Sequence, residues 1–231
     1  MLLLGSTAIM FKPVALVFLA LAIFSACSFA PVTLQTKQAS DLENRRIRRI
    51  AVLPPAVSTA VPAPSVPFSA APVTRSTERD AAESLAHFVH ASLVALPDWQ
   101  VVSESEVREA VMSLPPSSEE DRLKRVGEMV YADAVMMSRL QRFRERVGDE
   151  WGAKSPASVA FILDLVDVRR GDIIWSASFD ETQKSLSENP FSLGDIGARG
   201  VRWLSAEQLA QDGVRKAIGQ LHDVLARRPA S

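Results

Sequence analysis

The stretch VAFILDLVDVRRGDIIWSASFD, residues 159–180, decides the fold of this chain. Val159 to Val168 is apolar at both alternating positions except at Asp164, which predicts a central strand buried on both faces of a sheet. Ile173 to Asp180 alternates between apolar and polar side chains, which predicts a strand with one inward face. Its expected inward side chains are Ile173, Trp175, Ala177 and Phe179. Gly171 supplies the left-handed residue that a turn needs, so the two strands should form a hairpin.

Patterns on both sides of this hairpin predict a mixed α/β order. The run from Ala134 to Arg146 begins apolar and ends charged, as a strand that leaves the core would. The other expected elements are strand 50–53, helix 77–96, strand 99–102, helix 103–114, helix 117–130 and a final helix over 205–225. Early strands joined through a helix should be parallel, and the late meander antiparallel. We therefore predict an α/β (α+β) fold, a mixed sheet of about five strands with helices packed on it, in the order β-α-β-α-α-β-β-β-α.

The first 26 residues are predicted to be a signal peptide. Lys12 precedes an unbroken apolar run from Val14 to Phe24. This run is about 11 residues long and falls short of the roughly 20 that a membrane-spanning helix needs. Met10 opens a second and shorter version of the same signal, so Met1 and Met10 are alternative starts of translation.

The four residues Phe24–Cys27 resemble the lipobox of bacterial lipoproteins, although that family usually has leucine where this chain has Phe24. The resemblance implies cleavage after Ala26 and lipidation of Cys27, the only cysteine, which excludes an internal disulfide. Ser28 follows instead of aspartate, and this implies the outer membrane, with the domain facing the periplasm, if the source is Gram-negative. The alternatives are an ordinary cleaved secretory signal and an uncleaved anchor helix.

The remaining chain is predicted to be a tether followed by one domain. Residues 27–46 are expected to hold the lipidated cysteine and a flexible tether, and residues 47–228 a single periplasmic domain with a Pro/Ala-rich loop at 54–76. Clustered cations are candidate contacts to anionic head groups, or else a solvated lead-in to the first strand: Arg45, Arg46, Arg48 and Arg49. The formal net charge is only -1, so nucleic-acid binding is not expected.

The sequence contains no nucleophile elbow, phosphate loop, metal motif or dinucleotide fingerprint. We therefore expect no enzyme, no cofactor and no metal site. His87 and His90 lie three residues apart on a predicted helix, but no Glu-x-x-His arrangement or nearby cysteine supports a metal, so ordinary helix histidines are favoured. Asp164 is either a perturbed acid or, as favoured, a carboxylate that meets a backbone donor or lies at a wetter part of its strand.

Aromatic residues in predicted loops are the candidate contacts to a partner protein. Trp151 lies at the tip between two predicted strands, where it either contacts a partner or folds back onto its own hairpin. The loop that follows Phe179 is either a recognition face or a cover for the sheet edge. Its candidate contact residues are Phe191, Arg199, Arg202 and Trp203.

Four short motifs resemble one group of periplasmic domains: IAVLP at 50–54, PDWQVV at 97–102, YADAV at 131–135 and GDIIW at 171–175. Residues 50–225 are thereby similar to the domain shared by the TolB amino-terminal domain, the curli-secretion lipoprotein CsgG and the lipoprotein activators of penicillin-binding proteins. The resemblance implies a non-catalytic lipoprotein that binds an envelope protein. Its alternative is a structural or auxiliary subunit of an outer-membrane export or transport assembly, including a homo-oligomer. The long Pro-rich loop departs from the family pattern, and no strand pair has the reach of a membrane-inserting hairpin.

Overall fold

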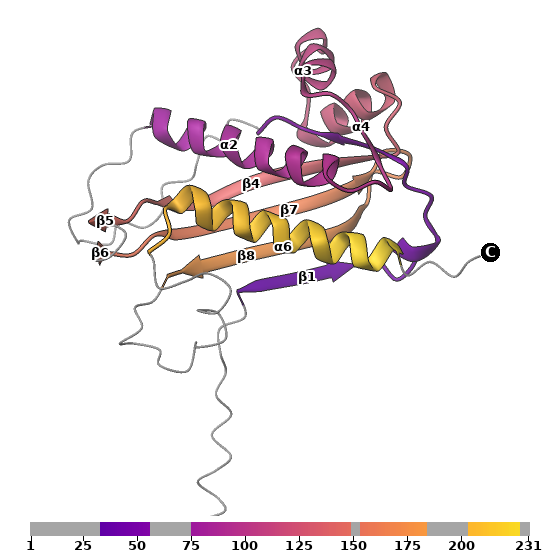
Figure 1. The fold of residues 1–231 in the computed structure, drawn as a ribbon. Coiled ribbons are helices and arrows are strands. Elements are labelled where there is room, and N and C mark those ends of the chain that lie inside the picture. Colours follow the sequence, from indigo (N-terminus) through magenta and orange to yellow (C-terminus); the bar gives the residue numbers. More distant parts are fainter. Residues whose placement is uncertain (1–32, 56–74, 149–152, 184–202, 227–231) are drawn as a thin grey trace, which may run out of the picture. The chain divides into compact units, whose positions relative to one another are not determined.

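The computed structural model describes residues 33–55, 75–148, 153–183 and 203–226. Its centre is a six-stranded mixed sheet in the order β1-β8-β7-β4-β2-β3 (Figure 1). The strands of this sheet are β1 (Leu34–Gln38), β2 (Arg49–Val52), β3 (Gln100–Val101), β4 (Ala134–Arg144), β7 (Ser158–Asp167) and β8 (Ile173–Thr182). The helices are η2 (Leu42–Asn44), α2 (Arg75–Val94), α3 (Glu104–Ser113), α4 (Glu119–Met129) and α6 (Ala206–Ala226). The predicted mixed α/β fold is confirmed, with one more strand in the sheet than expected.

The strand directions follow from the connections. β2 pairs in parallel with both β3 and β4, and the strands β4, β7 and β8 form an antiparallel meander. α2 crosses from β2 to β3, as a parallel connection requires. A two-stranded ribbon of β5 (Val147–Gly148) and β6 (Ala153–Ser155) extends the connection between β4 and β7.

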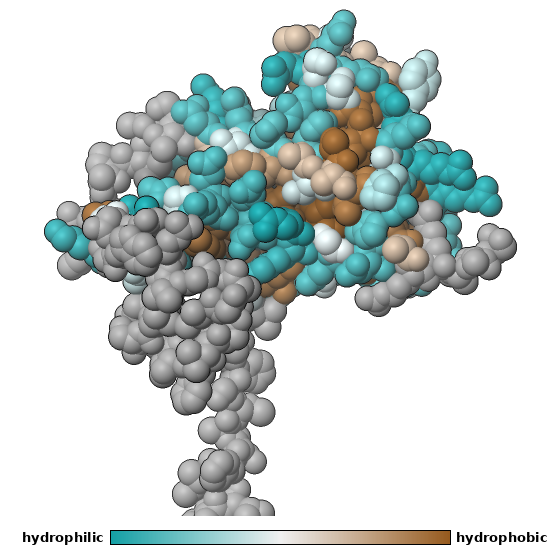
Figure 2. Space-filling view, viewed as in Figure 1, coloured by the Kyte–Doolittle hydropathy of each residue, from teal (hydrophilic) through white to brown (hydrophobic). Residues whose placement is uncertain are grey.

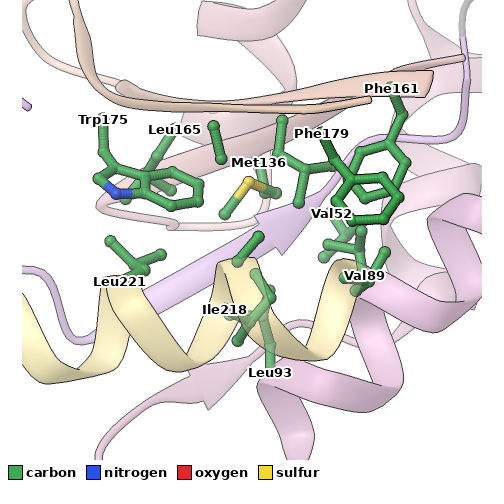
Figure 3. Close-up of a cluster of buried hydrophobic side chains, with 14 of the residues drawn as sticks. Val52, Val89, Leu93, Met136, Phe161, Leu165, Trp175, Phe179, Ile218 and Leu221 are labelled. Atoms are coloured by element: carbon green, nitrogen blue, oxygen red, sulfur yellow. The ribbon is translucent and has the colours of Figure 1, made fainter. Parts of the chain in front are cut away.

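One face of the sheet packs against α2 and α6 (Figure 1). Figure 3 shows Ile218 and Leu221 of α6 pointing toward sheet residues such as Trp175. The apolar stripe predicted for this helix is confirmed, because its five members are all buried: Leu209, Val214, Ile218, Leu221 and Leu225. α6 packs tightly against the sheet at Gly213, where an added Cβ would lie 2.8 Å from a ring carbon of Phe179.

The opposite face carries α3 and α4 at the end where β4 begins. A second apolar cluster forms there from Leu53, Val107, Leu123, Val126, Val135, Val166 and Val168, among others. The N-cap of α4 is Ser118, one residue later than the predicted cap, and the Ser118 hydroxyl accepts a hydrogen bond from the Asp121 N–H. Figure 2 shows an apolar strip beneath α3 and α4, toward the C-terminal end of α2. Val94 of α2 and Met112 of α3 are 56% and 73% exposed.

The prediction for Ile173 is wrong, because the β7–β8 ladder contains an irregularity. The register shifts beside Leu165, so that one additional residue enters β8. Such a bulge moves the residues on one side of it to the other face of the sheet. Ile173 is therefore 51% exposed, while Ile174 is fully buried. The remaining predicted inward residues are buried as expected: Trp175, Ala177 and Phe179.

The prediction of a flexible tether is wrong from residue 34 onward, because this segment belongs to the fold. β1 pairs antiparallel with β8, from Leu34 opposite Phe179 to Gln38 opposite Trp175. η2 follows and buries Leu42 completely. The sequence of β1, LQTKQ, contains one apolar residue, so it carries neither the apolar run nor the alternation that predicts a strand.

Candidate functional site

The strands define two opposite ends of the domain (Figure 1). At the end that we call proximal, β1 begins, β8 ends and the Thr33 carbonyl accepts a hydrogen bond from the Asp180 N–H at 3.0 Å. The distal end holds the β7–β8 turn, the turn between α4 and β4, and the arginines that precede β2. Asp172 in the β7–β8 turn lies eight residues before Asp180, about 26 Å along the strand at about 3.3 Å per residue.

Arg45 is held at the distal end by three carboxylates. Its guanidinium lies 3.0 Å from Asp41, 2.9 Å from Asp167 and 2.8 Å from Asp172, and its side chain is only 10% exposed. Arg170 also pairs with Asp41, at 3.1 Å. Hydrogen bonds from Arg45 lower the pKa of both Asp41 and Asp172, and the bond to Asp172 is the largest cause that raises the pKa of Arg45. We call these five residues the Arg45 cluster; they join the N-terminal segment to the β7–β8 turn.

The four arginines predicted to touch a membrane divide into two pairs. Arg45 is inside its cluster, and Arg49 donates to the Val130 carbonyl at 3.0 Å and to Glu106 at 3.1 Å. Arg46 and Arg48 are exposed. The prediction of a membrane contact therefore narrows to Arg46 and Arg48, and these two lie at the distal end, away from the point where the chain enters the sheet.

Two residues after the end of helix α4 stands a tyrosine, Tyr131, with a left-handed backbone. The φ angle of Tyr131 is 52°, and it is the only positive value at a residue other than glycine in the described ranges. The Ala132 N–H donates to the Gly127 carbonyl at 2.8 Å, and the Tyr131 N–H donates to the Glu128 carbonyl at 3.2 Å. This is the Schellman arrangement, in which the left-handed position is usually glycine. The left-handed conformation costs a residue with a Cβ about 1–2 kcal/mol.

Among the described residues, little packs against the tyrosine ring to compensate for this backbone. Tyr131 is 85% exposed, and Met129 in the last turn of α4 is 46% exposed. The Arg48 N–H donates to the Asp133 carboxylate at 2.9 Å, and the Val168 N–H donates to the Asp133 carbonyl at 3.1 Å. The backbones of Arg48 and Val168 therefore lie next to the turn that carries Tyr131, and Arg48 and Arg169, the residue after Val168, are exposed. We call this group the distal surface: Arg48, Met129, Tyr131 and Arg169.

The sequence contained one signal for Tyr131. The predicted helix over 117–130 is followed by Tyr131-Ala132 instead of the glycine that commonly closes a helix. The missing glycine does not by itself predict a positive φ angle at Tyr131, and one aromatic residue in a sequence does not show whether its side chain is exposed. In the sequence, Tyr131 was therefore identified only as the first residue of the motif YADAV at 131–135.

The structure brings a third titratable side chain to the two helix histidines. His87 Nδ1 lies 3.0 Å from Glu104 Oε1, and His90 Nδ1 lies 3.7 Å from the same oxygen. His90 Nε2 is 3.1 Å from the Val102 carbonyl, which is an acceptor, so Nε2 is the donor. Within the described residues, no group of three His, Cys, Asp or Glu side chains is arranged to hold a metal ion. The contacts connect α2 to the N-terminus of α3.

Asp164 is buried and has an arginine as its partner. Its side chain is 4% exposed and pairs with Arg139 of β4. This pairing differs from the backbone donor and the wetter strand position favoured from the sequence. On the same two strands, Arg142 donates to the Ser158 hydroxyl at 2.6 Å. An ion pair of this kind accounts for a buried carboxylate without any role in chemistry.

Several predicted site residues lie outside the described ranges, so their roles stay predictions: Ala26, Cys27, Trp151, Phe191, Arg199 and Arg202. The same holds for most of the Pro/Ala-rich loop. Trp203 is described; it is half-buried at the proximal end, and its carbonyl accepts a hydrogen bond from Arg146. Of the helices in the described ranges, none is long and apolar enough to cross a membrane.

No protein-family model matches the chain, and no curated protein matches it. Among solved structures, it is similar to the PelC dodecamer from Paraburkholderia phytofirmans, with 16% identity over 82% of this chain and 96% of that chain and a TM-score of 0.46. It is also similar to lipoprotein GNA1162 from Neisseria meningitidis, with 19% identity over 66% of this chain and 93% of that chain and a TM-score of 0.40. The LpoB C-terminal domain from Salmonella enterica is 16% identical over 59% of this chain and 83% of that chain, with a TM-score of 0.36. These similarities concern the fold alone, which is that of bacterial lipoprotein-like domains. They assign no activity, partner or assembly to this chain.

Proposed function

We propose that this protein is a lipid-anchored lipoprotein of the outer membrane, facing the periplasm, and that its domain binds another envelope protein without catalysing a reaction. The lipobox-like residues Phe24–Cys27, followed by Ser28, support the anchor and the membrane. In the described ranges, the two buried carboxylates are each paired with an arginine, Asp164 with Arg139 and Asp167 with Arg45. Ion pairs of this kind favour a structural role for these acids over proton transfer.

The observation that carries the proposal is the attachment of the N-terminal segment to the sheet. β1 and the Arg45 cluster hold the chain from Leu34 to Arg45. Between Cys27 and Leu34 stand the residues numbered 28–33, which extend at most about 22 Å. A lipid on Cys27 would therefore keep the proximal end close to the bilayer, within the reach of these residues. This geometry suits a domain that meets a partner close to the membrane.

The alternative is a subunit of an export or transport assembly, and one observation favours it. β1 is an edge strand, and four of its five residues are exposed. Such an edge can pair with a strand of a second copy. A stable ring or filament of the unlipidated protein in solution would favour this alternative over the adaptor.

Metabolic labelling with an alkyne-bearing fatty acid tests the anchor in cells. The wild-type protein should take up the label and fractionate with the outer membrane. Cys27→Ser should remove the label, and Arg46→Ala should leave it unchanged. An unlabelled wild-type protein, or a labelled Cys27→Ser variant, would exclude lipidation at this cysteine.

A further inference from the structure

We infer that the distal surface, formed by Arg48, Met129, Tyr131 and Arg169, docks a carboxylate-bearing protein segment that also presents an apolar or aromatic side chain. This inference rests on the adaptor function proposed above and names the place and the chemistry of the contact.

The first step is the backbone of Tyr131. A tyrosine holds the left-handed position at which glycine would close α4 without strain, with a φ angle of 52°. Its side chain is 85% exposed, so the domain gains little from its burial. Strained residues that no internal contact explains occur preferentially at functional sites. Within the described ranges the ring stays exposed, and a contact with a partner would account for it.

The second step is the composition of the surroundings. Met129, in the last turn of α4, adds a flexible apolar side chain that is 46% exposed. Tyrosine, methionine and arginine are enriched in protein interfaces, and tyrosine and arginine are common among the residues that dominate binding energy. The combination is typical of a surface that takes up a protein segment.

The third step is the charge of the flanks. Arg45 and Arg49, at the same end, are paired with carboxylates of the domain. Arg48 and Arg169 are instead exposed. Two acidic residues belong to the same stretch: Asp133 accepts hydrogen bonds from two backbone N–H groups through one oxygen, and Glu128 of α4 is exposed. The two exposed guanidinium groups favour carboxylates on the partner, because guanidinium and carboxylate form strong paired hydrogen bonds.

The fourth step is the position of this surface relative to the chain entry. The distal end lies about 26 Å along β8 from the proximal end, where residue 33 enters the sheet. An anchor on Cys27 leaves that end free for a partner. The occupant that the four steps favour is therefore an acidic protein segment and not the lipid head groups of the protein's own membrane.

A defined probe tests the inference: a fluorescent copolymer of glutamate and tyrosine, titrated with the mature lipidated protein in detergent and followed by anisotropy. The wild-type protein should bind it, more weakly at higher salt, and should bind a copolymer of lysine and tyrosine at least about tenfold more weakly. Tyr131→Gly and the double variant Arg48→Gln/Arg169→Gln should each weaken binding about tenfold, which corresponds to about 1.4 kcal/mol. Tyr131→Phe and the proximal variant Lys154→Gln should bind as the wild type does.

Three results would overturn the inference: no binding by the wild type, equal binding of both copolymers, or equal binding by the Tyr131→Gly variant. Loss of self-association upon Tyr131→Gly would also overturn it, since the occupant would then be a second copy. Thermal unfolding of Tyr131→Gly confirms that this variant is folded. The labelling experiment tests only the lipidation of Cys27, and the copolymer titration tests only the distal surface. The failure of the proposed anchor is therefore distinguishable from the failure of the proposed docking surface.

Discussion

The Arg45 cluster and the turn of Tyr131 lie at the same end of the domain and differ in how the structure accounts for them. Arg45 is 10% exposed, and three carboxylates of the domain surround it. Tyr131 is 85% exposed and holds a strained backbone. The ion pairs of Arg45 stabilise the folded domain, whereas the strained backbone and exposed ring of Tyr131 do not. Substitution at the two positions should therefore change stability in opposite directions.

The largest effect is expected for Arg45→Ala. This change leaves Asp167, whose side chain is 10% exposed, without its ion-pair partner. Removing one member of a buried pair costs about 3–5 kcal/mol in the free energy of unfolding. Urea denaturation measures this loss. Arg46→Ala is the matched control, because Arg46 is exposed, and it should stay within about 0.5 kcal/mol of the wild type. Equal effects of the two variants would show that the ion pairs of Arg45 do not stabilise the fold.

Two glycines of α6 provide the same contrast within one helix. An added Cβ at Gly213 would meet the Phe179 ring at 2.8 Å, and one at Gly219 would meet nothing within 4 Å. Gly213→Ala should therefore destabilise the domain by about 1–3 kcal/mol through overpacking. Gly219→Ala should stabilise it by up to about 1 kcal/mol, because alanine favours the helix. Chemical denaturation of both variants checks the signs, and a stabilising Gly213→Ala would contradict the packing of α6 on the sheet.

Acid should weaken the Arg45 cluster. Its hydrogen bonds lower the pKa of Asp41 and Asp172, so these carboxylates stabilise the fold above their unfolded pKa of about 3.9. This contribution is lost as the pH falls through their lowered folded values. The urea midpoint of the wild type should therefore decrease below about pH 4, and Arg45→Ala should show a smaller decrease. Parallel profiles for both proteins would show that the cluster does not cause the acid sensitivity.

The smallest change, with the opposite sign, is expected for Tyr131→Gly. Glycine takes up the left-handed backbone without a Cβ clash, so the variant should be more stable by about 1 kcal/mol. Tyr131→Ala also loses the ring but keeps the Cβ, and it should show no such gain. Thermal unfolding separates the two variants. If glycine and alanine had the same effect, backbone strain would not explain this position.

The regular elements were largely predictable because their signals are local. The hairpin of β7 and β8 follows from apolar runs around a glycine turn, and the helices follow from spacing and from serine caps. β1 could not be predicted, because its residues pair with β8 across more than a hundred residues of sequence and bury little. The exposed Ile173 could not be predicted either, since a register shift is a property of two paired strands.

For the site, the residues alone established the lipobox-like cysteine and the absence of known catalytic motifs, because these depend on residue identity and spacing. The roles of the arginines and of Tyr131 depended on the folded chain. Arg45 and Arg46 are neighbours in sequence, yet Arg45 pairs with Asp167 and Asp172 from the distant β7–β8 connection and Arg46 is exposed. A residue's charge and type are local properties, but its burial, its partners and its backbone strain arise only where separate segments pack together.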